Sequence, residues 1–415
     1  PNADSVLMGG KGNDVLISGS NVTTMSGGGG TNTFQFLSLN TTGAVTNTFA
    51  ALSNQATSAF DAITDLTVGD RIVLPLGLTW QGVKGASFGA DAVVGSAWFD
   101  ATTQSLNFRA SDGFHRILLP ASSTNLSWTA SSIANGLKLT VLPAAPESPS
   151  LASASDSGFA SNDGITNAVN PSFNVSLTGS GAVANNQIRL YADNQMVAVK
   201  VLTSSDIAAG QVSLTVGDKV TGLTLDATSL SQGQPVISVA QWAPGLGVDN
   251  NNLGYLSAPS VALSNVRIDV TAPTAPVMVL NTVSDSGSSN QDGVTNVAAP
   301  LVNVSFAREQ VSLNSKVNVL LSGQIVGSKF ITGNELAAGS AQVAVANLGA
   351  DGSKALTATL VDLAGNVSGS SPAISLALDR VAPSAPTLAL TSASDSGLKG
   401  DGLTKIDTPS LRVSF

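Results

Sequence analysis

Residues 284–300 have the sequence SDSGSSNQDGVTNVAAP, which joins a Ser-Asp-Ser-Gly turn to an Asp-Gly turn and a short Val-Thr-Asn segment. Two further segments repeat this pattern: SDSGFASNDGITNAVNP at 155–171 and SDSGLKGDGLTKIDTP at 394–409. Aspartate and glycine at fixed offsets are typical of tight turns, because aspartate bonds nearby backbone and glycine tolerates positive φ. The chain therefore contains a structural unit that recurs.

The spacing of these segments indicates the size of the unit. Their first aspartates are Asp156, Asp285 and Asp395, whose positions differ by 129 and then by 110. Either interval accommodates one β-sandwich of about 100 residues. An Ala-Pro pair precedes each segment and predicts a linker, at 145–146, 272–273 and 382–383.

Apolar residues alternate with polar ones between the second and third segments, which predicts strands with one buried face. The alternating sets are Val302, Val304, Phe306; Val317, Val319, Leu321; Leu356, Ala358, Leu360; and Ile374, Leu376, Leu378. Residues 322–324 and 362–366 are predicted to be turns between strands. About seven strands fit into the unit, which is the number in an immunoglobulin-like sandwich.

The series Asp-x-x-Ala-Pro, Ser-Asp-Ser-Gly, Asp-Gly-Val-Thr-Asn and Asp-x-Ala-Gly-Asn resembles the bacterial Ig-like repeats of large surface adhesins. The resemblance is close over 266–380 and good at both ends of 146–265. A third copy begins at 381 and stops after its expected second strand, so it cannot close a sandwich by itself. The resemblance implies repeat 1 at 146–270, repeat 2 at 271–380 and an incomplete third copy at 381–415.

The first 145 residues have a different period, with an apolar residue at every ninth position: Leu7, Leu16, Met25 and Phe34. GGKGNDVL at 9–16 fits the nonapeptide G-G-x-G-x-D-x-U, and GGGGTNTF at 27–34 fits it with asparagine for aspartate. These turns resemble the calcium-binding parallel β-rolls of RTX proteins, and residues 63–72 resemble the region that closes such rolls. The resemblance implies a β-roll with its closing β region at 1–145, and the whole chain is predicted to be all-β.

The composition supports an all-β chain and excludes several kinds of site. Of 415 residues 41 are glycine, and 11% are charged, against about 25% in an average soluble protein. The net charge of −9 argues against nucleic-acid binding through a basic patch. Without cysteine and with one histidine, the chain cannot form a disulfide, a zinc-thiolate site or a multi-histidine site. No apolar run reaches the roughly 20 residues of a membrane-spanning helix.

Calcium is the cofactor that the N-terminal turns imply. In a β-roll each nonapeptide forms half a coil, so Asp14 and Asn32, two nonapeptides apart, are expected to stack on one edge. Side-chain oxygens and glycine carbonyls of such loops supply the kind of ligands that Ca²⁺ prefers. The alternative is a degenerate roll without metal, because Thr23 stands at the acidic position of the intervening turn.

A second set of calcium candidates lies in the repeat loops and linkers. Several carboxylates that converge on one joint repel each other unless a cation neutralises them. A calcium ion there would stiffen the junction. The alternative is ordinary turn chemistry, with aspartate side chains bonded to nearby backbone. The candidate ligands are Asp156, Asp163, Asp269, Asp285, Asp292, Asp362, Asn366, Asp379, Asp395 and Asp401.

No residue pattern indicates a catalytic site, and the chain is not expected to be an enzyme. His115 lies in a predicted strand near Asp112 without a serine nucleophile motif, which favours a structural role. Part of the extra length of repeat 1 (129 against 110) is assigned to 243–255, where a longer loop could contact a ligand or a neighbouring subunit. The tryptophans could stack on sugars, although core packing is favoured: Trp80, Trp98, Trp128 and Trp242.

Acidity, absence of cysteine and RTX-like turns together resemble the substrates of type I secretion, which fold outside the cell when calcium binds. We therefore predict an extracellular structural or adhesive protein of the bacterial surface: a subunit of a surface layer, sheath or filament, or the stalk of a large adhesin. Its partners would be further copies, neighbouring surface proteins or surface glycans. The alternative is the non-catalytic, calcium- and carbohydrate-binding portion of a secreted polysaccharide-acting enzyme.

Overall fold

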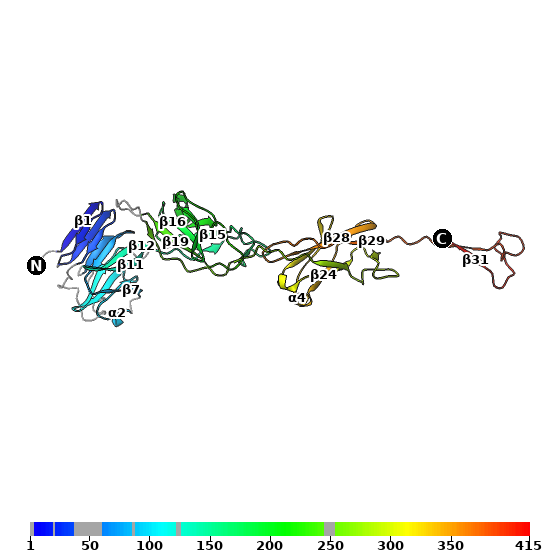
Figure 1. Ribbon diagram of the computed structural model, residues 1–415, viewed down its shortest axis with the longest axis horizontal. Helices are drawn as coiled ribbons and strands as arrows, with labels where there is room; N and C mark the ends of the chain where they lie inside the picture. Colours follow the sequence, from blue (N-terminus) through cyan, green and yellow to red (C-terminus); the bar gives the residue numbers. More distant parts are fainter. Residues whose placement is uncertain (1–3, 20, 37–59, 85–87, 122–125, 245–253) are drawn as a thin grey trace. The chain divides into compact units, whose positions relative to one another are not determined.

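The structure is a computed structural model that describes residues 4–19, 21–36, 60–84, 88–121, 126–244 and 254–415. Strands joined by turns dominate these residues, so the all-β prediction is confirmed (Figure 1). The chain divides into two compact units: the first contains the residues up to Thr271 together with Leu363–Gly365, and the second contains Ala272–Asp362 and Asn366–Phe415. Among the described residues, no helix is long and apolar enough to cross a membrane.

The N-terminal region consists of two sheets around one large core, with a smaller buried cluster of Phe60, Ala92, Trp98 and Phe114. The larger sheet has the order β1 (Ser5–Lys11), β3 (Thr23–Gly29), β5 (Asp61–Asp65), β10 (Gly113–Leu118), β9 (Ser105–Ala110), β8 (Ser96–Asp100) and β7 (Thr79–Lys84). The smaller sheet has the order β11 (Leu126–Ile133), β12 (Gly136–Pro143), β6 (Arg71–Leu74), β4 (Thr33–Gln35) and β2 (Val15–Ile17). A short helix, α2 (Phe88–Asp91), precedes β8.

The first strands of both sheets stack as a parallel roll. β1 pairs with β3, Ser5 opposite Thr23, and β2 pairs with β4, Val15 opposite Thr33. Both offsets equal two nonapeptides, which confirms the predicted stacking of alternate nonapeptides. Leu16, Met25 and Phe34 are all buried in the shared core.

Glycine permits the close approach of adjacent coils. Gly30 has φ +114°, and a Cβ on it would overlap the carbonyl oxygen of Gly12 in the preceding coil. Gly28 meets the carbonyl oxygen of Gly10 in the same way. Any side chain at these positions would force the coils apart and break the parallel hydrogen bonds.

Repeat 2 is a sandwich of two sheets. The first contains β22 (Val277–Leu280), β24 (Leu301–Ser305) and β27 (Ser340–Ala344); the second contains β23 (Val294–Thr295), β29 (Ile374–Leu378), β28 (Gly352–Val361), β25 (Lys316–Leu321) and β26 (Gln324–Phe330). The predicted alternation is confirmed, since Val302, Val317 and Leu356 are fully buried in one core. The turn 322–324 joins β25 to β26, with Ser322 at φ 51°.

Repeat 1 has the same two layers. Its strands are β13 (Ser150–Leu151), β15 (Ser172–Ser176) and β18 (Gln211–Thr215) in one sheet; β14 (Ile165–Thr166) and β21 (Arg267–Ile268) in a parallel pair; and β17 (Gln195–Val201), β16 (Gln187–Ala192), β19 (Ile237–Ala243) and β20 (Tyr255–Leu256) in another sheet. The third copy contains the first hairpin only, β30 (Thr387–Leu390) with β31 (Leu411–Ser414).

Strand register locates the extra length of repeat 1. Leu214 in β18 corresponds to Val343 in β27, an offset of 129, whereas Val239 in β19 corresponds to Ala358 in β28, an offset of only 119. The difference of ten positions therefore lies in 216–236, which the sequence pattern did not indicate. The other nine fall between β19 and β21, and residues 245–253 of the assigned stretch lie outside the described residues.

The segment 216–236 protects a sheet edge. Gly217 N–H donates to the Val197 carbonyl at 2.8 Å, and Val199 N–H donates to the Asp218 carbonyl at 2.9 Å. Both partners belong to the edge strand β17, whose backbone would otherwise be open to pairing with another chain.

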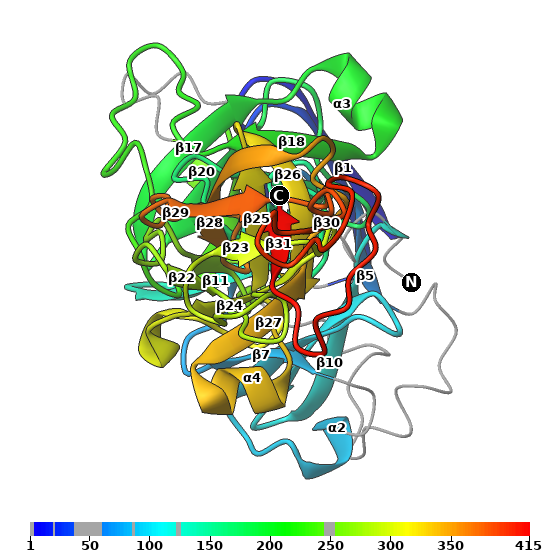
Figure 2. The ribbon, with the colours of Figure 1, turned by 90° about the vertical axis from the view of Figure 1, so that its right-hand side faces the viewer.

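Short helices that the strand pattern did not indicate interrupt both repeats at the same place: α3 (Ser204–Ala209) and α4 (Gly333–Ala338) (Figure 2). Repeat 2 also contains a 3₁₀ turn, η3 (Arg308–Gln310). Each α-helix begins with a capping box, Thr203 with Asp206 and Thr332 with Glu335. Hydrogen bonds from Thr203 hold the pKa of Asp206 below its usual value. The Thr-x-x-Asp and Thr-x-x-Glu patterns in the sequence are typical of helix N-termini and could have predicted both helices.

Gln241 is a buried polar residue in the core of repeat 1. It lies opposite Ile188 on the core face of β19 and is 1% exposed. Neither its Oε1 nor its Nε2 has a hydrogen-bond partner among the described residues. Repeat 2 places the fully buried Leu360 at the equivalent position.

Gln241→Leu is therefore expected to stabilise repeat 1 by about 1–3 kcal/mol, since it removes an unpaired buried amide. Hydrogen-exchange mass spectrometry of peptides from repeat 1 measures the change. The reciprocal Leu360→Gln should destabilise repeat 2 and leave repeat 1 unaltered. A Gln241→Leu variant less protected than the parent would contradict the assignment.

Candidate metal sites in the aspartate loops

The first aspartate of each repeat loop is buried and accepts the N–H of a loop glycine in all three copies, with the donor eight residues later in repeats 1 and 2 and five residues later in the third copy. These residues are buried, with exposed fractions of 8% for Asp156, 7% for Asp285 and 5% for Asp395. In each, Oδ2 accepts the backbone N–H of a loop glycine: Gly164 at 3.1 Å, Gly293 at 3.2 Å and Gly400 at 2.6 Å. This hydrogen bond joins the start of each loop to a glycine further along it.

The other carboxylate oxygen, Oδ1, is buried in all three aspartates and has no hydrogen-bond partner among the described residues. A buried charged oxygen without a partner costs free energy. Burial is the main cause of a raised pKa at Asp156, and the carboxylate of Asp163 raises it further. A cation at Oδ1 would offset both effects.

The second aspartates bond to the backbone of their own turns. Oδ1 of Asp163, Asp292 and Asp401 accepts the N–H two residues later, at 3.0, 3.0 and 2.9 Å respectively. This is the turn chemistry expected as the alternative to metal binding. It leaves the second carboxylate oxygen available to a ligand, so the two interpretations are compatible.

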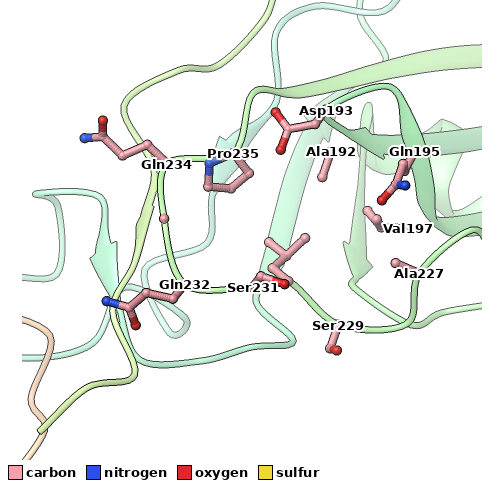
Figure 3. Close-up of a pocket in the computed structure, with 12 residues that line it drawn as sticks. Ala192, Asp193, Gln195, Val197, Ala227, Ser229, Ser231, Gln232, Gln234 and Pro235 are labelled. Carbon is pink, nitrogen blue, oxygen red and sulfur yellow. The ribbon is translucent and has the colours of Figure 1, made fainter.

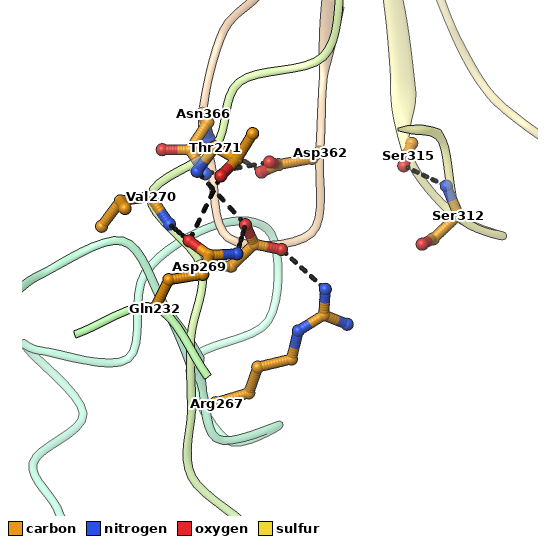
Figure 4. Close-up of polar contacts among 9 residues, drawn as sticks. All are labelled: Gln232, Arg267, Asp269, Val270, Thr271, Ser312, Ser315, Asp362 and Asn366. Atoms are coloured by element: carbon orange, nitrogen blue, oxygen red, sulfur yellow. Dashed lines mark hydrogen bonds and ion pairs between the residues drawn. The ribbon is translucent and has the colours of Figure 1, made fainter. Parts of the chain in front are cut away.

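The linker aspartates are held by residues near them. Asp269 receives a hydrogen bond from Gln232 at 3.0 Å and forms an ion pair with Arg267 at 2.8 Å (Figure 4). Asp379 accepts the N–H of Val381 at 3.0 Å. Both side chains are therefore held in place, and Asp269 already has a cationic partner.

The predicted pair Asp362 and Asn366 comes together in one turn. Asp362 Oδ1 accepts the N–H of Asn366 at 2.8 Å, and Oδ2 accepts its side-chain amide at 2.9 Å (Figure 4). The Asp-x-Ala-Gly-Asn pattern thus closes a turn through its own ends.

In the roll, the structure brings Asp14 and Asn32 together as expected from their spacing. Asn32 Oδ1 accepts the backbone N–H of Asp14 at 3.1 Å. β5 and β6, which pair in parallel with β3 and β4, form a third coil, and Asp70 of this coil accepts the N–H of Asn32 at 2.6 Å. Asx side chains therefore accept backbone N–H groups of the adjacent coil.

A cradle for a cation lies beside this ladder. A Cβ on Gly9 would lie 2.6 Å from both Asp14 Oδ2 and the carbonyl oxygen of Gly27. Asp14 Oδ2 has no hydrogen-bond partner among the described residues. A carboxylate and a carbonyl oxygen that converge on the space above a glycine are ligands of the type that Ca²⁺ takes.

Three acids of the third coil were not among the site residues predicted from the sequence, although aspartate recurs three times in DAITDLTVGD at 61–70. Asp65 accepts bonds from Ser26 Oγ at 2.9 Å, Gly27 N–H at 2.6 Å and Gly28 N–H at 2.8 Å. Asp61 accepts the N–H of Thr23 at 2.7 Å. With Asp70, these carboxylates satisfy backbone donors at the coil edges.

Within the described part of the chain, no three Asp, Glu or His side chains gather as a metal cluster. An ion at Asp14 or at the repeat loops would need backbone carbonyls and water to reach the roughly six to eight oxygens that calcium takes. The donors present fit a calcium site with few carboxylates, and they do not fit a transition metal.

His115 and the N-terminal tryptophans are structural, as predicted. His115 is 4% exposed, stacks on Phe108 at 4.9 Å and bonds to Asp112 at 2.9 Å. Trp98 is fully buried, and the ring centroids of Trp80 and Trp128 are 6.3 Å apart. These side chains pack against protein atoms.

Trp242 is half-buried and its ring is occupied by protein atoms. The Arg189 guanidinium lies 5.1 Å from the ring centroid, and Gly254 packs so closely that a Cβ on it would overlap Trp242 Cε2. Gln187 holds the same guanidinium through two bonds, at 3.1 and 3.0 Å. Trp242 therefore packs against protein atoms on the face of β19 opposite Gln241, outside the core in which it was predicted to lie.

A pocket of about 190 Å³ lies beside the 216–236 segment of repeat 1. The Gln232 and Gln234 side chains point away from the other lining residues (Figure 3). Asp193 Oδ1 is already bonded to the Val236 N–H at 3.0 Å. The polar groups therefore do not converge on one ligand position. The polar lining residues are Asp193, Gln195, Ser229, Ser231, Gln232 and Gln234.

Comparison with known proteins identifies one module. Residues 271–380 match the family model described as a bacterial Ig-like domain, so repeat 2 is similar to that domain. No curated protein matches the chain. Among solved structures, fibronectin(III)-like modules of Clostridium thermocellum CbhA show 12% identity over 60% of this chain and 93% of theirs, with a TM-score of 0.27. The tetra-tandem repeat from the extending region of a large adhesion protein shows 16% identity over 70% of this chain and 66% of its own, with a TM-score of 0.20.

Two of the roll carboxylates have raised pKa values. Burial raises the pKa of Asp61 to about 6, against the lowering effect of the Thr23 N–H. Burial raises the pKa of Asp70 as well. Both groups bind a proton more tightly in the folded state than in the unfolded chain, where aspartate titrates near about 3.9.

The stability of the N-terminal region is expected to fall as the pH rises from about 4 through 6, because the folded state must release these protons. Asp61→Asn removes one titration, so its urea midpoint should vary less with pH and exceed the parent value at pH 7. Tryptophan fluorescence follows the transition, and Asp91→Asn, an exposed acid in α2, is the control. An unchanged pH profile in Asp61→Asn would refute the raised pKa.

Proposed function

We propose that this chain is an extracellular structural and adhesive protein of the bacterial surface, and that calcium controls its folding and stiffness. The observation that carries the proposal is a threefold recurrence: Asp156, Asp285 and Asp395 each bury one unpartnered carboxylate oxygen at the same place in a module. A weak site repeated along tandem modules adds up to a mechanical or multivalent effect. The match of repeat 2 to a bacterial Ig-like domain supports the same role.

Calcium would be held at Oδ1 of the first aspartates, with the second aspartates of the loops beside them: Asp163, Asp292 and Asp401. Asp269, Asp379 and the Asp362–Asn366 turn would supply further ligands in the linkers and turns. In the roll, Asp14 Oδ2 and the Gly27 carbonyl would bind the ion, with Asn32 in the next coil. When bound, the ion supplies the positive charge that these buried oxygens lack.

Calcium dependence would couple folding to export. The chain would leave the cell unfolded through a type I secretion system and fold where calcium is abundant, so that binding free energy contributes to folding. Outside, it would act as a subunit of a surface layer, sheath or filament, or as the stalk of a large adhesin. Its partners would be further copies, neighbouring surface proteins or surface glycans.

Calcium titration of the metal-free chain tests the proposal, with near-UV circular dichroism and particle size measured together. We expect folding to be completed by calcium, with a stabilisation of about 2.7 kcal/mol at 100 times Kd. Ordered polymers would assign the chain to a surface array or filament, and a folded monomer would assign it to an adhesin stalk. No response at millimolar calcium would remove calcium from the function.

Asp285→Asn tests the site in repeat 2. Its amide oxygen can still accept the Gly293 N–H but carries no charge, so the calcium-dependent protection of repeat 2 should be lost while the metal-free protection stays. Hydrogen-exchange mass spectrometry with and without calcium makes the measurement. Glu309→Gln, an exposed acid of the same repeat, is the control. Equal calcium protection in Asp285→Asn and the parent would show that Asp285 is no ligand.

A further inference from the structure

We infer that each repeat grips its own outgoing linker through a side chain of the loop before β19 or β28, and that this contact bears tension along the chain. We call it the linker clamp: Gln232 with residues 269–271 in repeat 1, and Asp351 with Arg380 in repeat 2. The inference rests on the proposed structural function, because only a load-bearing protein uses it.

In repeat 1 the clamp is a neutral amide that contacts three consecutive linker residues. Gln232 Nε2 donates to Asp269 Oδ1 at 3.0 Å, and Oε1 accepts the Val270 N–H at 2.8 Å (Figure 4). The Thr271 hydroxyl donates to the same Oε1 at 3.3 Å. Gln232 is otherwise exposed, so its immobilisation costs side-chain entropy that the three contacts must offset.

In repeat 2 the clamp is an ion pair at the corresponding place. Asp351 Oδ1 accepts Arg380 Nε at 2.6 Å, and Oδ2 accepts the Arg380 backbone N–H at 3.1 Å. The guanidinium also donates to the Gly349 carbonyl at 2.9 Å. In repeat 1 an amide joins the loop before β19 to the residues that follow β21. In repeat 2 an ion pair joins the loop before β28 to the residue that follows β29 by two positions.

The clamp lies where load enters the module. The outgoing linker continues from a parallel strand pair, in which Asp269 N–H donates to the Thr166 carbonyl at 2.8 Å in repeat 1. In repeat 2, Asp379 N–H donates to the Thr295 carbonyl at 2.9 Å. Tension on the linker reaches the clamp first, and only then loads the hydrogen bonds of the parallel pair. Release of the clamp should therefore speed unfolding under force.

Constant-force measurement on single molecules of the full chain, folded at millimolar calcium and then pulled both with and without calcium, tests the inference. The two repeats are told apart by the length they release, since the extra length of repeat 1 (129 against 110) adds about 70 Å of extended chain. Gln232→Ala should raise the unfolding rate of repeat 1 about three- to tenfold and leave repeat 2 unchanged. Arg380→Ala should speed unfolding of repeat 2 only, and high salt should abolish that difference by screening the ion pair.

Matched controls lie off the load path. Gln234→Ala changes an exposed glutamine two positions from the clamp, and Gln324→Ala changes one at the start of β26. Both should unfold at parental rates. Gln232→Glu places a carboxylate against Asp269 and should speed unfolding of repeat 1 at least as much as Gln232→Ala.

Parental unfolding rates in Gln232→Ala, Gln232→Glu and Arg380→Ala would overturn the inference. The calcium titration of the same molecules is a separate readout. A full calcium response with unaltered unfolding rates would overturn the clamp alone. Accelerated unfolding in a chain that does not respond to calcium would support the clamp and overturn the calcium proposal alone.

Discussion

The hydrogen bond from a backbone N–H to an aspartate or asparagine oxygen is the interaction on which the rest of this structure depends. The chain is rich in turns, and a turn leaves backbone donors that no ladder pairs. Asn32 and Asp70 satisfy such donors between coils of the roll, and Asp285 satisfies one inside a repeat loop. Each bond also brings a carboxylate or amide into the protein, and at Asp285 it leaves the second carboxylate oxygen buried without a hydrogen-bond partner among the described residues.

The need to satisfy backbone N–H groups in turns explains why the proposed metal ligands of the repeat loops are also turn-forming residues. Aspartate closes the turn through one oxygen and presents the other, as Asp156 and Asp395 do. In the proposed function, the second oxygen is the one that would bind the ion. The raised pKa of Asp156 has that origin, since burial disfavours its charge and Asp163 adds to the effect.

The two repeats show how one architecture accommodates different solutions. Both repeats cover the corresponding edge strand, through the Gly217 N–H in repeat 1 and the Ala346 N–H in repeat 2, and repeat 1 adds Asp226 from its extra length. Repeat 1 holds its linker with an amide from the segment 216–236. Repeat 2 has a shorter loop and uses the Asp351–Arg380 ion pair. Gln241 and Leu360 occupy equivalent core positions with opposite polarity. The sandwich tolerates these changes because the two sheets and their alternating apolar residues stay the same.

Local pattern in the sequence was enough to predict the strands, the nonapeptide coils and the repeated turns. Val302 and Val304 alternate with polar neighbours, and a period of two leaves only one way to bury them. Asp14 and Asn32 are two nonapeptides apart, which places them on one edge of a parallel roll. The tertiary structure alone decided the pairing of Gln232 with a distant linker, the burial of one oxygen in each first aspartate, and the roles of Asp61 and Asp65. Those outcomes depend on which distant backbone groups are left unpaired after the sheets have formed, and no local pattern records that.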